Sequence, residues 1–268
     1  VLGDDALDAA VTGDNNVAVG KSALTANTSG ASNVAVGEAA MDANTTGGSN
    51  VAVGRDALGA NTTGSFNQAF GRNALLTNTT GQYNNAFGND ALKVNTASNN
   101  TAVGHAALVA NTTGAANTSV GYSSLYQNTT GAANGAFGYQ TLFSNTTGAD
   151  NVAVGTNALY NNLTASNNTA VGRESLFANT TGAANTSVGY QSLTANTTGA
   201  SNTVVGKQAA KANTTGANNV AIGDSAAFAA TTSTGNVIIG QAAVQTGVFT
   251  GFNNVVIGKL AGEDLTSA

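Results

Sequence analysis

The chain repeats one short apolar segment that begins after an Asn and ends at a Gly. Residues 50–54 read Asn-Val-Ala-Val-Gly, and residues 16–20, 33–37 and 151–155 have the same five letters. The segment recurs every 17 residues, apart from one step of 16 and one of 18. A fixed step of this size predicts a solenoid, in which each coil must stack on its neighbours to bury an apolar face. The residues that define the repeat include Asn16, Gly20, Asn33, Gly37, Asn50, Gly54, Asn151 and Gly155.

The three residues between the Asn and the Gly alternate in size, which is typical of a strand, and the Gly that follows suits a corner with positive φ. The residue before the Gly is always large and apolar, and we expect it to form a core column. The residue before that is small and must point to the opposite face of the strand. A strand with two apolar faces is buried on both, so we expect a second chain to cover one face. The alternative is that the small residue is tolerated on a solvated face. The predicted core column includes Val19, Val53, Phe70, Phe87, Phe137 and Ile222.

A second apolar column lies four residues after each Gly, and Leu58 and Leu75 are members of it. This column could lie on a short strand or on a single helical turn, and helix propensity does not decide between them because a segment this short cannot hold a helix alone. We favour a second short strand or an extended bend, with the Leu side chains in the core. The next segment reads Asn-Thr-Thr-Gly in many repeats, a composition that favours a turn. Stacking of the coils would place these Asn side chains in amide ladders along the solenoid axis.

These patterns predict an all-β fold: a parallel β-solenoid, or β-roll, of about fifteen 17-residue coils. We expect a single continuous array over residues 1–268, without a linker. The chain opens at Val1-Leu2-Gly3 inside a repeat and stops near Ser267-Ala268 partway through a coil. We therefore expect it to be a segment of a longer fibre.

Composition narrows the classes of partner. Only 8% of the residues are charged and the formal net charge is -5, with no Lys/Arg cluster of the kind that follows a phosphate backbone. Nucleic acid is not an expected partner. No run of about 18 apolar residues is present, so we expect no direct membrane span. Cys is absent, which excludes disulfides and thiol chemistry.

The sequence offers little catalytic chemistry. The single His, His105, lies in a variable column, and no motif for metal, nucleotide or nucleophilic catalysis can be assembled around it. We expect no enzyme activity, no catalytic residues, no metal and no cofactor. The Asn-x-Thr triplets match the glycosylation sequon, but their period indicates a structural turn. The column just after the strand Gly has no constant chemistry and is expected to face outward, where surface contacts would vary. This column includes Arg55, Arg72, Tyr122, Tyr139 and Tyr190.

The run Asn-Val-Ala-Val-Gly-x-x-Ala-Leu-x-x-Asn-Thr-Thr-Gly resembles the repeats of trimeric autotransporter adhesin heads and of tail-fibre-like proteins. The resemblance covers residues 1–268. It implies a left-handed parallel β-roll, three copies of which associate into a surface-exposed head that binds host or matrix surfaces.

From the repeat and this resemblance we predict a non-enzymatic extracellular structural fibre or adhesin shaft that self-associates into a homotrimer or filament. Its expected place is the cell surface or the virion surface, and its partners are other copies and a host, matrix or glycan surface. One alternative is a phage tail fibre or receptor-binding fibre. Another is an ice- or glycan-binding β-solenoid that presents Thr rows such as Thr45/Thr46 and Thr62/Thr63.

Overall fold

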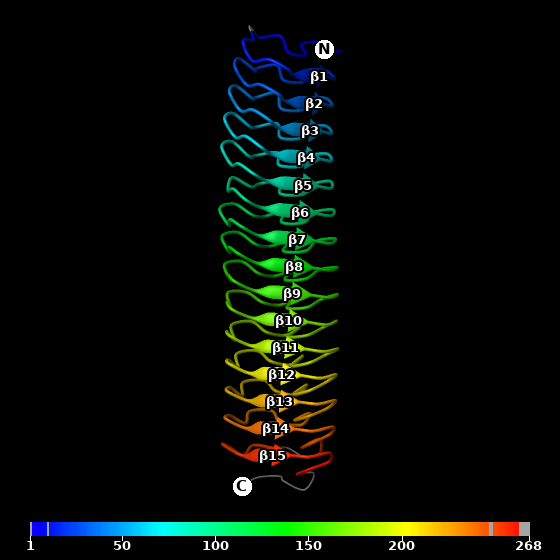
Figure 1. Cartoon of the computed structure of the whole chain (residues 1–268), viewed down its shortest axis with the longest axis vertical. Helices are drawn as coiled ribbons and strands as arrows, with labels where there is room; N and C mark the ends of the chain where they lie inside the picture. Colours follow the sequence, from blue (N-terminus) through cyan, green and yellow to red (C-terminus); the bar gives the residue numbers. More distant parts are fainter. Residues whose placement is uncertain (1, 10, 247–248, 263–268) are drawn as a thin grey trace. The chain divides into compact units, whose positions relative to one another are not determined.

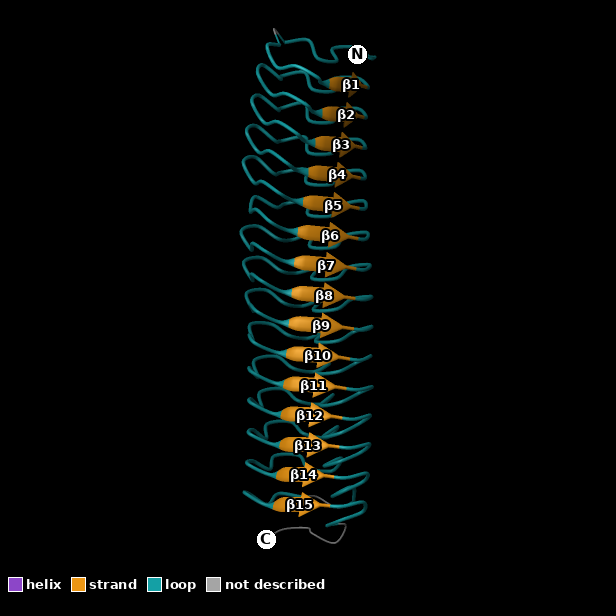
Figure 2. Ribbon diagram, viewed as in Figure 1, coloured by secondary structure: helices purple, strands orange, loops and turns teal. Residues whose placement is uncertain are grey.

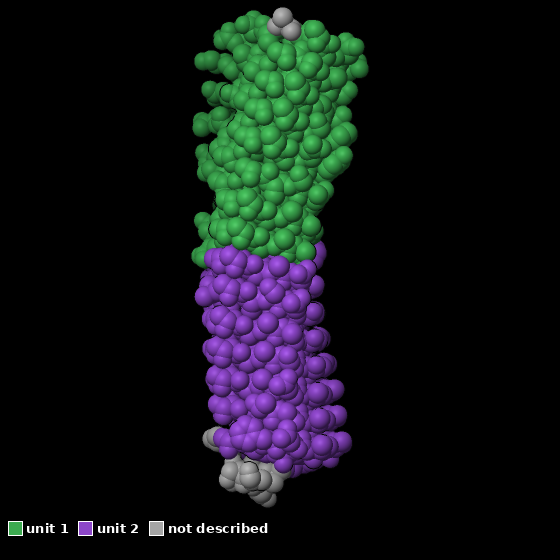
Figure 3. Space-filling model, turned by 90° about the vertical axis from the view of Figure 1, so that its left-hand side faces the viewer, with its two compact units in different colours: residues 1–133 green, residues 134–268 purple. Residues whose placement is uncertain are grey.

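The computed structural model describes residues 2–9, 11–246 and 249–262. The chain divides into two compact units, residues 1–133 and residues 134–268, which Figure 3 shows in different colours. Val1 and Ser267-Ala268, on which the expectation of a longer fibre rests, lie outside the described residues.

Each unit is a stack of short parallel strands that follow one another in chain order (Figures 1 and 2). Neighbouring strands pair in register, so that Val17 lies opposite Val34 and Val152 opposite Thr169. The prediction of an all-β parallel solenoid with coils of about 17 residues is confirmed, and the described residues include no helix. The first unit contains β1 (Val17–Val19), β2 (Val34–Val36), β3 (Val51–Val53), β4 (Gln68–Phe70), β5 (Asn85–Phe87), β6 (Thr101–Val103) and β7 (Thr118–Val120). The second unit contains β8 (Gly135–Phe137), β9 (Val152–Val154), β10 (Thr169–Val171), β11 (Thr186–Val188), β12 (Thr203–Val205), β13 (Val220–Ile222), β14 (Val237–Ile239) and β15 (Val255–Ile257).

The Gly that ends each strand is required by backbone geometry and by space. Gly54 has φ +135°, in a region that residues with a Cβ rarely adopt. A Cβ added there would also lie 2.6 Å from the carbonyl oxygen of Gly71 in the next coil. The coils therefore stack so closely at this corner that only hydrogen fits between the two backbones.

The segment after the corner is a series of turns rather than the second strand or extended bend that the sequence suggested. Asp56 and Leu58 have φ values of 57° and 54°, and Phe66, at the end of the same coil, has φ 60°. Left-handed residues reverse the direction of the chain within a few positions, so the segment cannot extend. Its N–H groups still bond the next coil, as Leu58 N–H does to the Ala74 carbonyl at 2.9 Å.

The interior of each coil is thin and holds small residues against one Leu. Ala52, Ala57 and Leu58 are fully buried, and Leu75 is fully buried in the next coil. Leu58 and Leu75 thus lie in the core, as the sequence predicts. Where the strand contributes a larger residue, the opposite wall contributes a smaller one: Val204 in the centre of β12 is buried and the Leu position of that coil is Ala210.

The prediction of a core column before the Gly is wrong. Val19, Val53 and Phe70 are half-buried, and Phe87, Phe137 and Ile222 are exposed. The small central residue of each strand points inward instead, as Ala18 and Ala52 do. The reason is volume, because the Leu of each coil already fills the interior and leaves room for only a methyl group on the opposing strand.

Two columns of buried Asn close the interior, as the sequence predicts. In the turn column, Asn44 Nδ2 donates to Asn27 Oδ1 at 2.9 Å in the preceding coil and to the Gly47 carbonyl at 3.0 Å in its own turn. In the strand column, the backbone N–H of Asn50 donates to Asn33 Oδ1 at 3.0 Å and its Nδ2 donates to the Gly64 carbonyl at 2.9 Å. Its Oδ1 accepts from the backbone N–H of Asn67 at 2.9 Å. The amides satisfy backbone carbonyls that side chains of another type would leave buried without a donor.

Candidate functional site

The outer face of the strands carries a row of large apolar residues. It consists of the first and third residues of each described strand: the third is Val, Ile or Phe in all fifteen, the first is Val, Thr, Gln, Asn or Gly, and none of these residues is charged. In the first unit Val103 and Val120 are exposed, and in the second Val154 and Ile222 are exposed. Contiguous apolar surface of this kind marks a site of interaction with another molecule.

The outer face also shows pairing of large and small residues within a strand. In β8 the first residue is Gly135 and the third is Phe137. A Cβ added to Gly135 would lie 3.3 Å from Phe137 Cε2. The ring therefore lies across the Gly. Where the third residue is Val or Ile, the first is Val or Thr. In the other two strands that end in Phe, the first residue is Gln68 or Asn85, so the pairing of a large residue with Gly is particular to β8. The Gly inside a strand is the signal in the sequence that could have indicated it.

Aromatic residues on this face and at the corners stack on their counterparts in the next coil. Phe70 and Phe87 stack with centroids 4.8 Å apart and planes 7° apart, and Phe143, Tyr160 and Phe177 form a continuous stack in the second unit. Because the ring faces contact each other, most of these side chains present ring edges to the solvent. They stabilise the coil stack, by about 0.5–1.5 kcal/mol for each pair.

The variable column after the Gly lies on the surface, as the sequence predicts. Tyr122, Tyr139 and Tyr190 are 50%, 49% and 40% exposed, and Arg55 and Arg72 are exposed as well. Arg173 lies over the ring of Tyr190 at 5.9 Å, and His105 stacks on Tyr122 at 5.3 Å. Their role in contacts with other molecules stays a prediction. Residues of this column follow one another from coil to coil, so these contacts join neighbours in adjacent coils and do not gather the column at one site.

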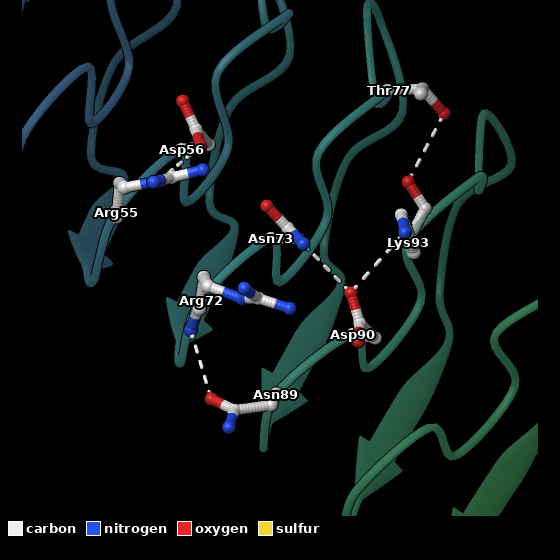
Figure 4. Close-up of polar contacts among 8 residues, drawn as sticks. All are labelled: Arg55, Asp56, Arg72, Asn73, Thr77, Asn89, Asp90 and Lys93. Atoms are coloured by element: carbon white, nitrogen blue, oxygen red, sulfur yellow. Dashed lines mark hydrogen bonds and ion pairs between the residues drawn. The ribbon is translucent and has the colours of Figure 1, made fainter.

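A small polar network lies at this corner in the first unit (Figure 4). Asp90 Oδ1 accepts a hydrogen bond from Asn73 Nδ2 at 2.8 Å and forms an ion pair with Lys93 Nζ at 3.4 Å. The Asn73 hydrogen bond and the Lys93 charge hold the pKa of Asp90 below its ordinary value. Arg55 pairs with Asp56 of its own coil at 2.9 Å. The network joins adjacent coils and leaves the Asp90 carboxylate charged and bonded.

A similar network joins three coils of the second unit. Glu174 Oε2 accepts from Gln191 Nε2 at 2.7 Å, and Gln191 Oε1 accepts from Gln208 Nε2 at 3.1 Å and from Lys211 Nζ at 3.0 Å. The Gln191 hydrogen bond and the neighbouring Arg173 lower the pKa of Glu174. Burial has the opposite effect at Asp42, whose pKa is raised.

The two Thr residues of each turn differ in what they can contact. Thr45 Oγ1 donates to the Thr62 carbonyl of the next coil at 3.0 Å, whereas Thr46 and Thr63 are exposed. The first Thr therefore links coils, and only the second contributes a row to the surface.

Among the described residues there is no group of three or more His, Cys, Asp or Glu side chains placed to hold a metal ion. The same part of the chain encloses no pocket. It also contains no apolar helix of the length that would cross a bilayer.

Comparison with known proteins returned no match to a family model, to a curated protein or to a solved structure.

Proposed function

We propose that the chain is a non-enzymatic extracellular structural fibre or adhesin shaft that associates with further copies of itself. The uncharged apolar outer face of the strands is the observation that carries this proposal. An isolated chain leaves this face in contact with water, at a cost of about 25 cal/mol for each Å² of apolar surface. Covering it by the same face of another copy removes that cost.

A second copy fits this face for two reasons. The face carries no charge at any strand, so two copies meet without placing like charges or unpaired charges in the contact. Both copies also repeat with the same period, so one favourable contact recurs at every coil. Association as a homotrimer, with left-handed coils, is the arrangement that the resemblance to adhesin heads implies.

The hydrogen bonds that hold adjacent coils together also support a structural role. Backbone, Asn and Thr hydrogen bonds recur at coil after coil, as between Asn44 and Asn27 and between Thr45 and Thr62. Such a stack resists local distortion along its axis because each coil is bonded to both neighbours. Display at a cell or virion surface, with a host, matrix or glycan surface as the partner, would use the exposed corners of this stack.

Light scattering coupled to size exclusion tests the proposal. The full chain is expected to elute with a mass that is a multiple of the monomer mass at micromolar concentration. The double variant Val103→Glu with Val120→Glu places two charges on the outer face of β6 and β7 and is expected to elute as a monomer. Both side chains already face outward, so circular dichroism should remain unchanged.

The matched control is Thr46→Glu with Thr63→Glu, which adds the same charge at exposed turn positions of the same unit. It should keep the mass of the unmodified chain. A monomeric unmodified chain at 100 micromolar would remove self-association from the proposal. Dissociation of the control to the same extent would show that total charge, not the outer face, governs association.

A further inference from the structure

The chain contains fifteen Asn-x-Thr or Asn-x-Ser triplets, the sequence that accepts N-linked glycans. All fifteen lie in the part of the chain that the structure describes, and the Asn is buried in thirteen of them. The two exceptions are residues 99–101 and 167–169, which both read Asn-Asn-Thr and begin with an exposed Asn. Neither belongs to an Asn-Thr-Thr-Gly turn, so the structural role of the turns does not account for these two triplets.

In the buried triplets the amide nitrogen of the Asn is already in use. Asn44 is fully buried, and its Nδ2 donates to Asn27 Oδ1 at 2.9 Å and to the Gly47 carbonyl at 3.0 Å. An Asn amide has two N–H donors, so both are occupied. The same two kinds of contact recur at Asn61 and Asn111. A sugar on such a nitrogen would have to lie inside the stack, so the folded chain cannot carry a glycan there.

The triplet at residues 99–101 has the opposite arrangement. Asn99 is exposed, Asn100 is buried in the strand ladder and Thr101 is half-buried, so the middle residue points inward and the two outer residues lie at the surface. The backbone N–H groups of Asn99 and Thr101 bond the carbonyls of Gln82 and Asn117, at 3.0 and 2.8 Å. Their side chains make no hydrogen bond with other described residues. The Asn99 amide is therefore free to react.

The triplet at residues 167–169 repeats this arrangement in the second unit. Asn167 is exposed, Asn168 is buried and Thr169 is half-buried. The backbone N–H of Asn167 bonds the Ala149 carbonyl at 3.1 Å, and that of Thr169 bonds the Asn185 carbonyl at 2.8 Å. The Asn167 amide and the Thr169 hydroxyl make no hydrogen bond with the described residues. Each unit thus presents one complete triplet at its surface.

The backbone does not by itself require Asn at this position. Asn99 and Asn167 have φ values of 63° and 62°, in the left-handed region that Asn adopts more readily than most residues. However, Ser49, Tyr83 and Ala116 occupy the same position in other coils, with φ between 56° and 58°. The corner therefore accepts several residue types, and its geometry does not explain the Thr two residues later.

We propose that Asn99 and Asn167 are sites of N-linked glycosylation in the folded chain. The donor is a glycosyl diphosphate, in which C1 of a sugar is bonded to a phosphate oxygen. A bond forms between this C1 and the Asn Nδ2, the C1–O bond breaks, the diphosphate leaves with the electron pair, and the amide loses one proton. A glycan is bulky and polar and needs a surface position, which both Asn residues have. The inference does not rest on self-association.

Incubation of the folded full chain with a soluble N-glycosyltransferase and UDP-glucose tests the inference. Mass spectrometry of the intact chain and of its peptides is expected to show two added hexoses, one at Asn99 and one at Asn167. A tryptic digest of the denatured chain is the control for the transferase. No amide is buried in the digest, so it should also accept hexoses at triplets that are buried in the folded chain.

Two variants test the triplets themselves. Thr101→Val removes the hydroxyl and keeps Asn99, and Val occupies this strand position in β1 and β2. It should melt at the temperature of the unmodified chain and accept one hexose instead of two. Asn218 is exposed at the corner before β13, but the residue two positions later is Val220. Val220→Thr should therefore accept three hexoses, and the matched control Val220→Ala should accept two.

Three results would overturn the inference. The first is a folded chain that accepts no hexose while its digest does. The second is a folded chain that accepts hexoses at the buried triplets, and the third is a Thr101→Val variant that is still modified at Asn99. Light scattering of the same sample reports association separately. A monomer that carries both hexoses would remove self-association and leave this inference intact.

Discussion

The turn ladder of Asn amides ends at two places, and the two ends are built differently. In the second unit it runs through Asn145, Asn162, Asn179, Asn196 and Asn213 and stops because the next coil has Ala230 instead of Asn. Thr214 N–H still bonds the Thr231 carbonyl at 2.7 Å there. In the first unit it is interrupted at Asn78, because the next coil is one residue short, and it resumes where Asn111 Nδ2 donates to Asn95 Oδ1 at 2.7 Å. Within the described part of the chain, residues 79–81 donate no backbone hydrogen bond.

Both ends leave a buried Oδ1 without a donor, at Asn78 and at Asn213. The difference lies in the backbone. A substitution removes one side-chain partner and keeps the register of the stack, whereas a deletion moves every acceptor in the turn. At these two junctions the shortened coil therefore changes the backbone hydrogen bonds of the turn, whereas the substitution changes only the ladder of side-chain amides.

The largest expected effect comes from disturbing the backbone contact between coils. Gly54→Ala places a Cβ 2.6 Å from the Gly71 carbonyl oxygen and forces Ala into φ +135°. We expect it to lower the free energy of unfolding by at least about 4 kcal/mol, measured by urea denaturation. Gly59→Ala, at a Gly without positive φ and with its nearest contact at 3.4 Å, is the control and should cost far less. Equal costs would show that the corner tolerates a Cβ.

The second prediction compares the interior of the ladder with its end. Asn61 donates to Asn44 Oδ1 at 2.7 Å and to the Gly64 carbonyl at 3.0 Å, and accepts from Asn78. Asn61→Ala leaves these buried partners unsatisfied and should cost about 3 kcal/mol in urea denaturation. Asn78→Ala should cost less, because Asn78 Oδ1 has no partner to lose. The distinction between ladder interior and ladder end is wrong if Asn78→Ala costs the same or more.

Hydrogen exchange compares the turn at the short coil with a regular turn. Among the residues that the structure describes, the amides of Thr79 and Thr80 donate no backbone hydrogen bond, whereas those of Thr45 and Thr46 bond the Thr62 carbonyl. We expect the first pair to exchange about 100-fold faster than the second in the native state, because they require no opening of a hydrogen bond. Protection of all four amides to the same degree would contradict the difference between the short coil and the regular coils.

Extending the amide ladder of the second unit beyond Asn213 should have a smaller effect on stability. Ala230→Asn offers a side-chain amide to Asn213 Oδ1 and so extends the ladder of the second unit by one coil. A satisfied buried hydrogen bond contributes about 1 kcal/mol, which is the expected gain in the free energy of unfolding. Ala230→Ser, which is polar but too short to bridge the coils, serves as the control. A loss of stability in Ala230→Asn would mean that the neighbouring Phe249, which is buried beside it, leaves no room for the amide.

The smallest expected effect is on pH dependence. Asp90 in the short coil and Glu174 in the second unit both have lowered pKa values, so their contributions to stability are present above their ordinary pKa values of 3.8 and 4.5. Stability should therefore fall as the pH drops below these values and the carboxylates become protonated in the native state. The raised pKa of Asp42 acts in the opposite direction, since protonation relieves its burial. Asp90→Asn should weaken the dependence of the urea midpoint on pH between pH 5 and pH 3. If the midpoint of the variant changes with pH as much as that of the unmodified chain, Asp90 does not cause the loss of stability.

The sequence predicted much of the fold because the repeat constrains it strongly. The positions of Gly20 and Gly54 followed from the period, and their positive φ values follow from what a tight corner requires. The buried Leu58 and the Asn ladder followed from the same reasoning. The interruption of the ladder at residues 78–81 could not be predicted in this way. The sequence of this turn matches that of its neighbours, and only the coil after it is different.

By itself the sequence determined the solenoid, the step of its coils and the two Asn columns, since a strict period allows no other way to satisfy so many identical positions. Only the tertiary structure decided which face of each strand is inside. Size alone suggested that Val53 and Phe87 face the core, but the coil is so thin that Leu58 and its counterparts fill it. Ala then takes the inner face, and the larger residues remain outside. The volume of the interior is a property of the folded coil, and it cannot be predicted from any single position of the sequence.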